Sequence, residues 1–593
     1  IYLVGENMRA NGETNLFGEV TGVSGPVVTV KVFDHIRDLM MNEFVFVGER
    51  KLAGEVSNMH GNTAYIQVYE DTSGLGHGDS AFRTRELISA KLGPGLVGNV
   101  YDGLQRPLNT MWTEFGPYIP AGAKSPRLPK NKRWEFSPLV KEGALVNEGD
   151  IIGVVKETEL IDHKIMVPPG LGGRVIELSE GSYAVDDIVA VLRRGGETIP
   201  LALSHSWPVR KERPYLRKLE PDTPLLTGQR VLDLFLPVAK GCTVALVGGF
   251  GTGKTILHHT LARYLNVDVI IYVGCGERGN EVADLLQKFS TLADPETGIR
   301  LMNRSIIIAN TSNMPVASRE ASVYTGLTFA EYYRDMGYDV ALLIDSTTRW
   351  AEALREIASR QGIMPGEEGY PPYLASRIAS NFGRAGKVEC LGQRIGSVSI
   401  IGSVSPSGGD FSEPVTQKTV QVVRALWALD PELAYRRHYP AVNLQQSFTF
   451  YEQVIPPFFH EREEALQLYA QKYDLERIVR LVGLGALSDK ERVTMKNIEL
   501  LEDAFMKQNA LHPIDAYTPL RRQIRLLDLV MYFHRSCMKA LESNVPAEPL
   551  ITTSLRREIE ALKEVPEDVF DDEYDRLRTR IGAHMLRLVR THA

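Results

Sequence analysis

The segment GGFGTGKT, residues 248–255, constrains the fold of this chain more than any other feature of its sequence. It fits the pattern Gly-x-x-x-x-Gly-Lys-Thr, with the apolar run CTVALV before it and the helical pattern ILHHTLARYL after it. Between a strand and a helix, such a loop turns successive backbone N–H groups toward an anion at the helix N-terminus. A chance glycine-rich turn is the alternative, and the flanking strand and helix argue against it. The segment therefore predicts an α/β domain that binds a nucleoside triphosphate.

The side chains of this loop have separate expected tasks. Lys254 is expected to reach the β- and γ-phosphates, and the hydroxyl of Thr255 is expected to bind Mg²⁺. The predicted nucleotide-binding residues of the loop are Gly248, Gly249, Phe250, Gly251, Thr252, Gly253, Lys254 and Thr255.

A second charged segment, CGERGNE, follows the apolar run VIIYVG. In a parallel sheet, ligands gather at the carboxyl ends of the strands, so this turn is expected to face the same nucleotide. Glu277 is the candidate to orient the attacking water, Arg278 to support the phosphates, and Glu281 to serve the outer shell of the metal. A solvated charged turn is the alternative.

A third apolar run, VALLIDS, ends in Asp345. A carboxylate in this position is typical of a strand whose aspartate holds Mg²⁺ through water. Asp345 as the cap of the following helical pattern is the alternative, and both roles are compatible. Arg349, one helical turn later, is expected to point toward the γ-phosphate.

The predicted secondary structure of the rest of the chain changes along its length. Short β-like runs separated by glycine come first, and a second β-rich segment covers about residues 140–191. From Trp207 apolar strands alternate with amphipathic helices, which predicts a parallel sheet with helices on its faces. After about Phe450 only helical periodicity remains, which predicts a helical bundle. Lys164 in the second segment invites comparison with the hairpin lysine of biotinyl and lipoyl carriers, but KIMVPP favours an ordinary strand.

Composition narrows the class of protein. Hydrophobic residues make up 44% and charged residues 24%, as in globular proteins, and the net charge of −7 argues against a nucleic-acid partner. No apolar run reaches the roughly 18 residues needed to span a bilayer, so we expect contact with a membrane only through partners. The four cysteines lack CxxC spacing, which favours a reducing compartment without a zinc site. The chain begins at Ile1 rather than methionine, so it stays an open question whether another segment precedes it.

Several longer motifs support a family resemblance. With GGFGTGKT, GCGERGNE, ANTSNMP, DSTTRWAEALREI, GEEGYPPYL and SPSGGDFSEPVT in one chain, the sequence resembles the catalytic A subunit of vacuolar-type and archaeal-type rotary ATPases. The similarity runs over nearly the whole chain. GCGERGNE and the inserted β-rich segment separate it from F-type, flagellar and secretion relatives. The resemblance implies a multidomain fold with an N-terminal β-barrel (1–88), a β-rich bulge (89–206), a RecA-like α/β P-loop nucleotide domain (207–448) and a C-terminal helical bundle (449–593).

The resemblance also implies an activity and partners. It implies an ATP hydrolase that uses Mg²⁺ and drives rotation and the transport of protons, or in some relatives sodium ions. Three copies would alternate with three non-catalytic subunits that donate an arginine finger, and central and peripheral stalk subunits would complete the complex. The chain would be cytoplasmic and peripheral on a membrane, vacuolar or of another acidic organelle in a eukaryote, and the plasma membrane in a prokaryote.

Some positions depart from the family pattern. By resemblance, Tyr439, Ala510 and Leu511 belong to the adenine pocket, where the family usually has phenylalanine in place of Tyr439 and Leu511. Base stacking is therefore expected to differ here. From the residues alone, Phe448, Phe450, Tyr439 or Phe505 are the candidates to cover the base, and each is alternatively a core residue. Gly383 and Ile395 stand where glutamates are common.

Two other classes of function are the alternatives. A homohexameric RecA-like motor, either a secretion ATPase or an RNA helicase, would share the phosphate loop, but the acidic balance and the inserted β segment argue against it. A non-enzymatic assembly protein would have no chemical need for intact Lys254, Thr255, Glu277 and Asp345 together.

Overall fold

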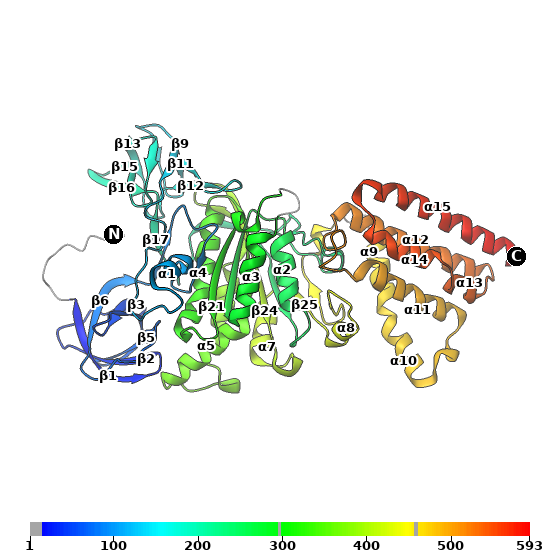
Figure 1. The fold of residues 1–593 in the computed structure, drawn as a ribbon, viewed down its shortest axis with the longest axis horizontal. Coiled ribbons are helices and arrows are strands. Elements are labelled where there is room, and N and C mark those ends of the chain that lie inside the picture. The colour runs from blue at the N-terminus through cyan, green and yellow to red at the C-terminus, as the bar shows by residue number, and fades with distance from the viewer. Residues whose placement is uncertain (1–14, 294–297, 456–459, 593) are drawn as a thin grey trace.

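The structure is a computed structural model that describes residues 15–293, 298–455 and 460–592. Figure 1 shows an elongated molecule with a β-barrel at one end, a twisted sheet flanked by helices in the middle, and a group of helices at the other end. A second β-rich unit projects from the side of the middle part. The first 14 residues of the predicted barrel segment lie outside the described residues.

The N-terminal barrel is confirmed. Buried and less buried side chains alternate along its strands, so one face of each strand fills the interior with valine, isoleucine and phenylalanine. The strands are β1 (Leu16–Ser24), β2 (Val27–Val32), β3 (Glu43–Val47), β4 (Leu52–His60), β5 (Thr63–Val68) and β6 (Ser80–Leu87). They close in the order β1-β2-β5-β4-β3-β6.

The projecting unit, here called the bulge, consists of two four-stranded sheets packed on a shared apolar core. Its strands are β9 (Trp134–Pro138), β10 (Leu145–Val146), β11 (Ile151–Lys156), β12 (Asp162–Met166), β13 (Gly173–Leu178), β14 (Gly181–Tyr183), β15 (Ile188–Arg194) and β16 (Glu197–Ala202). Lys164 lies within β12 and its Nζ donates to the carbonyl of Met336 at 2.7 Å. The interpretation of this segment as an ordinary strand is confirmed.

The segment between barrel and bulge belongs partly to the central sheet. Here β7 (Ser89–Leu92) pairs with β17 (His205–Pro208), and β8 (Val100–Tyr101) pairs with a strand of the nucleotide domain, followed by α1 (Leu108–Phe115). The chain thus adds an edge strand to the central sheet before it enters the bulge. We therefore propose that the bulge begins at β9 rather than at residue 89.

The middle of the molecule is the predicted parallel sheet. Its main path runs β26-β25-β19-β24-β22-β20-β21-β8, and most neighbours are parallel. Its strands are β18 (Tyr215–Leu219), β19 (Thr243–Val247), β20 (Val269–Glu277), β21 (Ser305–Thr311), β22 (Asp339–Asp345), β23 (Gly386–Cys390), β24 (Ile395–Val404), β25 (Ala425–Ala428) and β26 (Phe448–Thr449). The apolar runs read from the sequence are buried on both faces, as expected for such a sheet.

Helices flank this sheet on both sides (Figure 1). They are α2 (Lys254–Tyr264), α3 (Gly279–Thr291), α4 (Val316–Asp335), α5 (Thr347–Arg360), α6 (Leu374–Gly383), α7 (Pro414–Val420) and α8 (Pro431–Tyr435). The π-helix η1 (Val231–Phe235) precedes β19 and contributes four apolar residues to the core.

The C-terminal part is helical, as predicted, and shares one continuous apolar cluster with η1 and the central sheet. Its helices are α9 (His460–Ala470), α10 (Lys472–Val482), α11 (Asp489–Leu501), the π-helix η7 (Glu502–Met506), α12 (Leu520–Glu542), α13 (Ala547–Ile551), α14 (Leu555–Ala561) and α15 (Glu567–His592). Along the described parts of the chain, no helix combines the length and apolar character needed to cross a bilayer.

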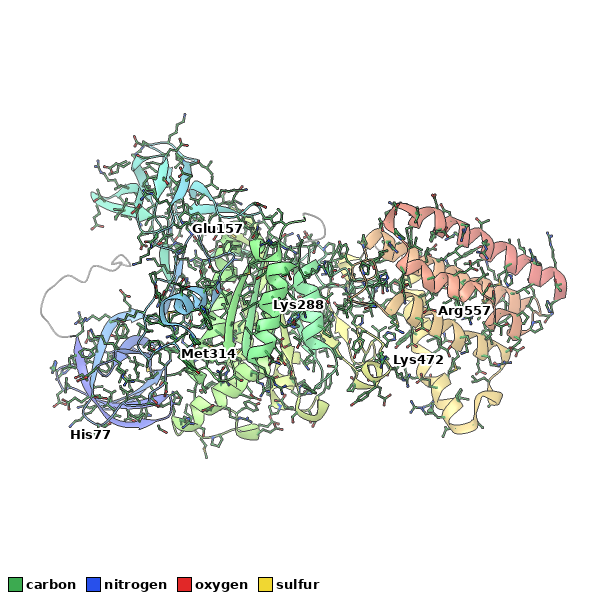
Figure 2. All side chains as sticks on the ribbon, viewed as in Figure 1. His77, Glu157, Lys288, Met314, Lys472 and Arg557 are labelled. Carbon is green, nitrogen blue, oxygen red and sulfur yellow. The ribbon has the colours of Figure 1, made fainter. Side chains whose placement is uncertain are left out.

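A buried polar cluster fixes the bulge to α4. Glu157 accepts hydrogen bonds from two backbone N–H groups, and its Oε2 lies 2.7 Å from Nδ1 of His163. Nε2 of His163 lies 2.8 Å from the hydroxyl of Tyr332, and Tyr333 donates to Glu157 at 3.0 Å. Figure 2 labels Glu157 where the bulge meets the sheet domain. The buried donors and acceptors of this junction therefore satisfy one another.

Candidate active site

The phosphate loop connects the carboxyl end of β19 to the N-terminus of α2, as the sequence predicts. Gly253 caps α2 with φ of +90°, in the left-handed region that favours glycine. A Cβ at this position would lie 3.2 Å from Cε1 of Tyr439. Thr252 is buried and its hydroxyl donates to the carbonyl of Gly249 at 2.8 Å, whereas Phe250 is almost fully exposed. The loop is thus shaped by its own backbone and by a tyrosine from another segment.

The ammonium of Lys254 lies over the loop. Its Nζ donates to the carbonyls of Gly248 at 2.5 Å and Gly249 at 2.8 Å. Burial lowers the pKa of Lys254, whereas the negative charges of Asp345 and Glu277 raise it. The structure therefore brings this lysine and both predicted carboxylates into one electrostatic site.

Glu277 ends β20, next to the strand that ends in Asp345. In the register of this parallel pair Gly274 lies opposite Asp345. Burial, the charge of Asp345 and a close approach of Glu281 raise the pKa of Glu277 to about 9. Three carboxylates therefore gather at the carboxyl ends of two adjacent strands, where the sequence places them.

Asp345 is buried and held by two hydroxyls. Ser403 donates to its Oδ1 at 2.6 Å, and Tyr272 donates to its Oδ2 at 2.9 Å. The following helix α5 is capped by Ser346, whose hydroxyl accepts from the N–H of Arg349. The alternative that Asp345 caps this helix is therefore wrong, because Ser346 is the cap and the Asp345 carboxylate is held by Ser403 and Tyr272 instead.

The two predicted arginines differ in their surroundings. Arg349 is a cation that lowers the pKa of Glu277, and its guanidinium donates to Glu352 at 2.8 and 3.1 Å. A Cβ on Gly276 would meet Cβ of Arg349 at 2.8 Å, so a glycine is required at this close approach. Arg278, by contrast, is exposed at the N-cap of α3. Its support of the transition state stays a prediction.

The charge of this cluster fits a divalent cation. The repulsion that raises the pKa of Glu277 comes from Asp345 and Glu281, and a bound cation would relieve it. Within the described residues, no group of three His, Cys, Asp or Glu side chains is suited to hold a metal alone. Mg²⁺ ordinarily takes one or two protein ligands together with waters and phosphate oxygens. Thr255, Asp345 and Glu281 are compatible with such a site.

Tyr439 lies against Gly253 of the phosphate loop, and its backbone is hydrogen-bonded to the segment that follows η7. The N–H of Gln508 donates to the carbonyl of Tyr439 at 2.7 Å, and Leu511 is 91% exposed in the same segment. Phe505 is fully buried against Phe235, with ring centroids 5.4 Å apart. Of the aromatic candidates for the base, Phe505 is therefore a core residue, whereas Tyr439 touches the phosphate loop.

Comparison with known proteins decides the family. The models of the ATP synthase alpha/beta family match the nucleotide-binding domain over residues 228–449 and the β-barrel domain over 20–85. The A subunit of the A-type ATP synthase of Methanopyrus kandleri is 47% identical over 585 residues, 96% of this chain and 98% of that protein. The chain belongs to the ATP synthase alpha/beta family.

Further matches place it among the A-type and V-type members of this family. The ATP synthase alpha/beta barrel-sandwich domain matches residues 125–210, and the C-terminal domain of V and A type ATP synthase matches 448–550. The V-type ATP synthase alpha chain of Acetivibrio thermocellus is 46% identical, over 96% of this chain and 99% of that protein. The resemblance drawn from the motifs is confirmed.

A solved structure shares the fold at low identity. The assembled ATPase EscN from the type III secretion system of enteropathogenic E. coli superposes with a TM-score of 0.62 and 20% identity, over 86% of this chain and 99% of that chain. This likeness concerns the fold alone.

Sequence reasoning missed the groups that surround Asp345 in this ATP synthase homologue. Tyr272 and Ser403 lie on β20 and β24, on either side of β22, and reach the carboxylate across the sheet. His258 and His259 on α2 lie with ring centroids 6.3 and 6.4 Å from that of Tyr272. The available signal was a tyrosine hydroxyl within the otherwise apolar run VIIYVG, which needs a partner when buried.

Gly383 and Ile395, the two positions where the family commonly has glutamate, lie outside the site. Gly383 ends α6, and a Cβ there would have nothing within 4 Å. Ile395 is 55% exposed at the start of β24, whereas the end of this strand at Val404 accepts a hydrogen bond from the phosphate loop. At about 3.3 Å per residue the two ends of β24 are roughly 30 Å apart.

Proposed function

We propose that this chain is the catalytic subunit of an A-type or V-type rotary ATP synthase, and that it hydrolyses ATP at its phosphate loop. The observation that carries the proposal is the convergence of Lys254, Glu277 and Asp345 at the carboxyl ends of three strands. In a chain of this family, that arrangement supplies a phosphate ligand, a carboxylate for the attacking water and a carboxylate for the metal.

The residues of the chain divide the chemistry between them. The N–H groups of the loop and the ammonium of Lys254 hold the β- and γ-phosphates, and Lys254 exchanges its two carbonyl acceptors for phosphate oxygens. Mg²⁺, when bound, neutralises charge on the phosphates, and Thr255 and Asp345 hold it, with Glu281 in its outer shell. Glu277 orients water in line with the γ-phosphate.

The charges around Glu277 determine whether its carboxyl group is protonated. A pKa near 9 keeps this carboxyl protonated at neutral pH, and an acid cannot accept a proton from water. Arg349 already lowers this pKa within the chain. Mg²⁺ and an arginine of a partner chain would add positive charge and thereby favour the carboxylate form of Glu277. This makes hydrolysis depend on full assembly of the site.

The proposed subunit assembly is the one that the family resemblance implies. We propose that three copies alternate with three copies of a non-catalytic nucleotide-binding subunit that supplies the arginine finger. Central and peripheral stalk subunits would couple hydrolysis to rotation and to transport of protons or sodium ions. The chain would then lie on the cytoplasmic side of a membrane, attached through these partners and without contact to nucleic acid.

The test is ATP hydrolysis by the complex purified with its partners. Replacing Lys254 by alanine removes the phosphate ligand while leaving the loop backbone, so turnover should fall by at least about 100-fold. Lys496→Ala is the matched control, because it removes the same side chain from α11, outside the site, where that side chain is 46% exposed. Turnover retained in Lys254→Ala would overturn the assignment of the catalytic site.

A further inference from the structure

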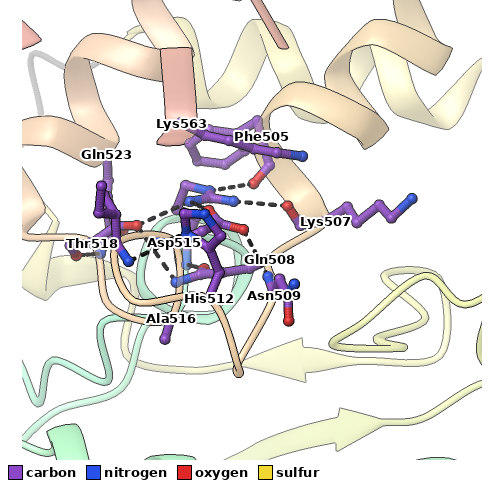
Figure 3. Close-up of polar contacts among 12 residues, drawn as sticks. Phe505, Lys507, Gln508, Asn509, His512, Asp515, Ala516, Thr518, Gln523 and Lys563 are labelled. Atoms are coloured by element: carbon purple, nitrogen blue, oxygen red, sulfur yellow. Dashed lines mark hydrogen bonds and ion pairs between the residues drawn. The ribbon is translucent and has the colours of Figure 1, made fainter. Parts of the chain in front are cut away.

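A buried arginine joins the nucleotide domain to the segment that follows η7. Arg230 precedes η1 and is fully buried. Its Nε donates to the carbonyl of Phe505 at 2.6 Å, and its Nη2 donates to the carbonyl of Lys507 at 2.7 Å. Its Nη1 donates to Oδ1 of Asp515 at 2.7 Å and to the hydroxyl of Thr518 at 2.9 Å. Figure 3 shows the partners Phe505, Lys507, Asp515 and Thr518 close together, at the end of η7 and in the loop that leads to α12.

Residues 508–511 lie between these contacts along the chain, and we call them the base segment because the family resemblance assigns Ala510 and Leu511 to the adenine pocket. Oδ2 of Asp515 accepts from the N–H of Asn509 at 2.7 Å, so the same carboxylate binds Arg230 and one end of the base segment. Oδ1 of Asn509 accepts in turn from the N–H of Leu511 at 3.0 Å. The ion pair with Arg230 therefore sets the shape of a loop whose outer side chain is exposed.

Gln508 ties the base segment to the nucleotide domain a second time. Its side-chain oxygen accepts from the N–H of Arg230 at 2.9 Å, and its side-chain nitrogen donates to the carbonyl of Gly228 at 2.8 Å. Its own N–H donates to the carbonyl of Tyr439, whose ring lies against Gly253 of the phosphate loop. An unbroken series of contacts thus runs from Arg230 to the phosphate loop.

We propose that Arg230, paired with Asp515, is a positioning residue that holds the base segment beside Tyr439 and thereby sets the affinity of the site for the base of the nucleotide. The inference rests on the proposed function, because it assigns a task at the same nucleotide site. Arg230 acts through the base segment and touches neither the phosphates nor the reacting water. Its removal should weaken binding of a nucleotide and spare binding of a bare triphosphate.

The chemistry of arginine explains why this residue type is needed. The planar guanidinium of Arg230 donates four hydrogen bonds, to two carbonyls, a carboxylate and a hydroxyl. A lysine ammonium lacks this planar arrangement of donors and cannot replace all four bonds. A buried ion pair contributes little net stability compared with apolar packing, so its main effect here is to select one loop geometry.

The test compares two ligands on the full chain. Calorimetry would measure the binding of MgATP and of magnesium tripolyphosphate, which lacks base and ribose, to the wild type, Arg230→Lys and Asp515→Asn. We expect Arg230→Lys to weaken MgATP binding roughly 10-fold, as for loss of about 1.4 kcal/mol, and to change tripolyphosphate binding less than about 2-fold. Asp515→Asn keeps the volume and one acceptor but leaves Arg230 buried without its counter-charge, so it should show the same selectivity.

Arg462→Lys is the matched control. Arg462 is also buried and donates from α9 to the carbonyls of Leu234 and Phe235 in η1 and to the carboxylate of Glu452, all of which lie outside the base segment. This variant should leave the ratio of the two affinities unchanged. In the assembled complex, Arg230→Lys should raise the KM for ATP and keep kcat within about 2-fold.

Two outcomes would overturn the inference. Equal losses for both ligands in Arg230→Lys and Asp515→Asn would mean that the pair only supports the fold, and unchanged ATP binding in both would mean that it does not position the base segment. If Arg230→Lys does not fold, Asp515→Asn alone decides between these results. A wild-type chain that binds neither ligand would instead overturn the proposed function, and this inference with it.

Discussion

The two sides of the nucleotide site are built in different ways. On the phosphate side, Lys254, Glu277 and Asp345 each lie at or just after the end of a strand of one parallel sheet, so the sheet alone brings them together. On the proposed base side, Tyr439 and the base segment meet through contacts that span the chain, such as the bond between Arg230 and Gln508 over 278 positions. The phosphate side depends on local sequence and the base side on the packing of the C-terminal helices.

Because the two sides are built differently, we expect substitutions in them to have different effects. The backbone of the phosphate loop is fixed by its own glycines and by the sheet, so substitutions there should act on chemistry more than on geometry. The base side is held by long-range contacts such as those of Arg230 and Gln508, so substitutions there should act on affinity. The following predictions test this division.

The largest effect is expected from Glu277→Gln. The amide keeps the size of the side chain but cannot act as a base toward water, so kcat should fall by about 10²–10⁴-fold. Binding of MgATP should persist, because the loop and Lys254 are unchanged. Steady-state hydrolysis by the complex and calorimetry measure the two quantities. A variant that keeps kcat within about 3-fold would assign the water to another group.

The same residue predicts a pH dependence of stability. The pKa of Glu277 rises from its ordinary value of 4.5 to about 9 in the folded chain. Between these values the folded state binds more protons than the unfolded state, so this group destabilises the fold progressively as pH rises from about 4.5 to 9. Thermal unfolding of the isolated chain should show a Tm that falls over this range more in the wild type than in Glu277→Gln. Parallel curves would contradict the raised pKa.

A smaller effect is expected from Tyr272→Phe. The substitution removes the hydroxyl that donates to Oδ2 of Asp345 at 2.9 Å and keeps the ring. Loss of a hydrogen bond to a charged group is worth about 1.5 kcal/mol, so the Mg²⁺ concentration for half-maximal hydrolysis should rise roughly 10-fold. Ser403→Ala removes the donor to Oδ1 and should act in the same direction. An unchanged Mg²⁺ requirement in both variants would show that these hydroxyls do not position Asp345.

The smallest effect is expected from Gly383→Glu, which restores the residue common in the family. Open space surrounds this position, and it lies at the end of α6 outside both sides of the site. Hydrolysis and ATP affinity should stay within about 2-fold of the wild type, as for a surface substitution. A larger change measured in the complex would mean that this surface matters for assembly.

The sequence predicted the phosphate side well because its geometry is local. A strand, a glycine loop and a helix are read from adjacent residues, and parallel strands bring their ends to one edge. The four-part fold and the family were predicted as well. The proposed start of the bulge at β9 rather than at residue 89 could not be read from the sequence, because β8, a strand of two residues, leaves no periodic pattern to detect.

The base side and the support of Asp345 were harder to predict for a physical reason. Nothing in the residue type of Phe505 distinguishes a ring that packs on Phe235 from one that covers a base. The partners of Asp345 come from strands on either side of β22, and those of Arg230 from beyond residue 500, so they depend on register and packing. Sequence patterns of period two or 3.6 carry no information about such pairs.

Native mass spectrometry of the protein, purified gently from its own cells, tests the central claim most directly. A catalytic chain whose site needs an arginine from a different partner should appear as three copies with three copies of another large subunit, together with stalk subunits. Six copies of this chain without a second large subunit would contradict the account, and would favour a homohexameric motor built on the same fold.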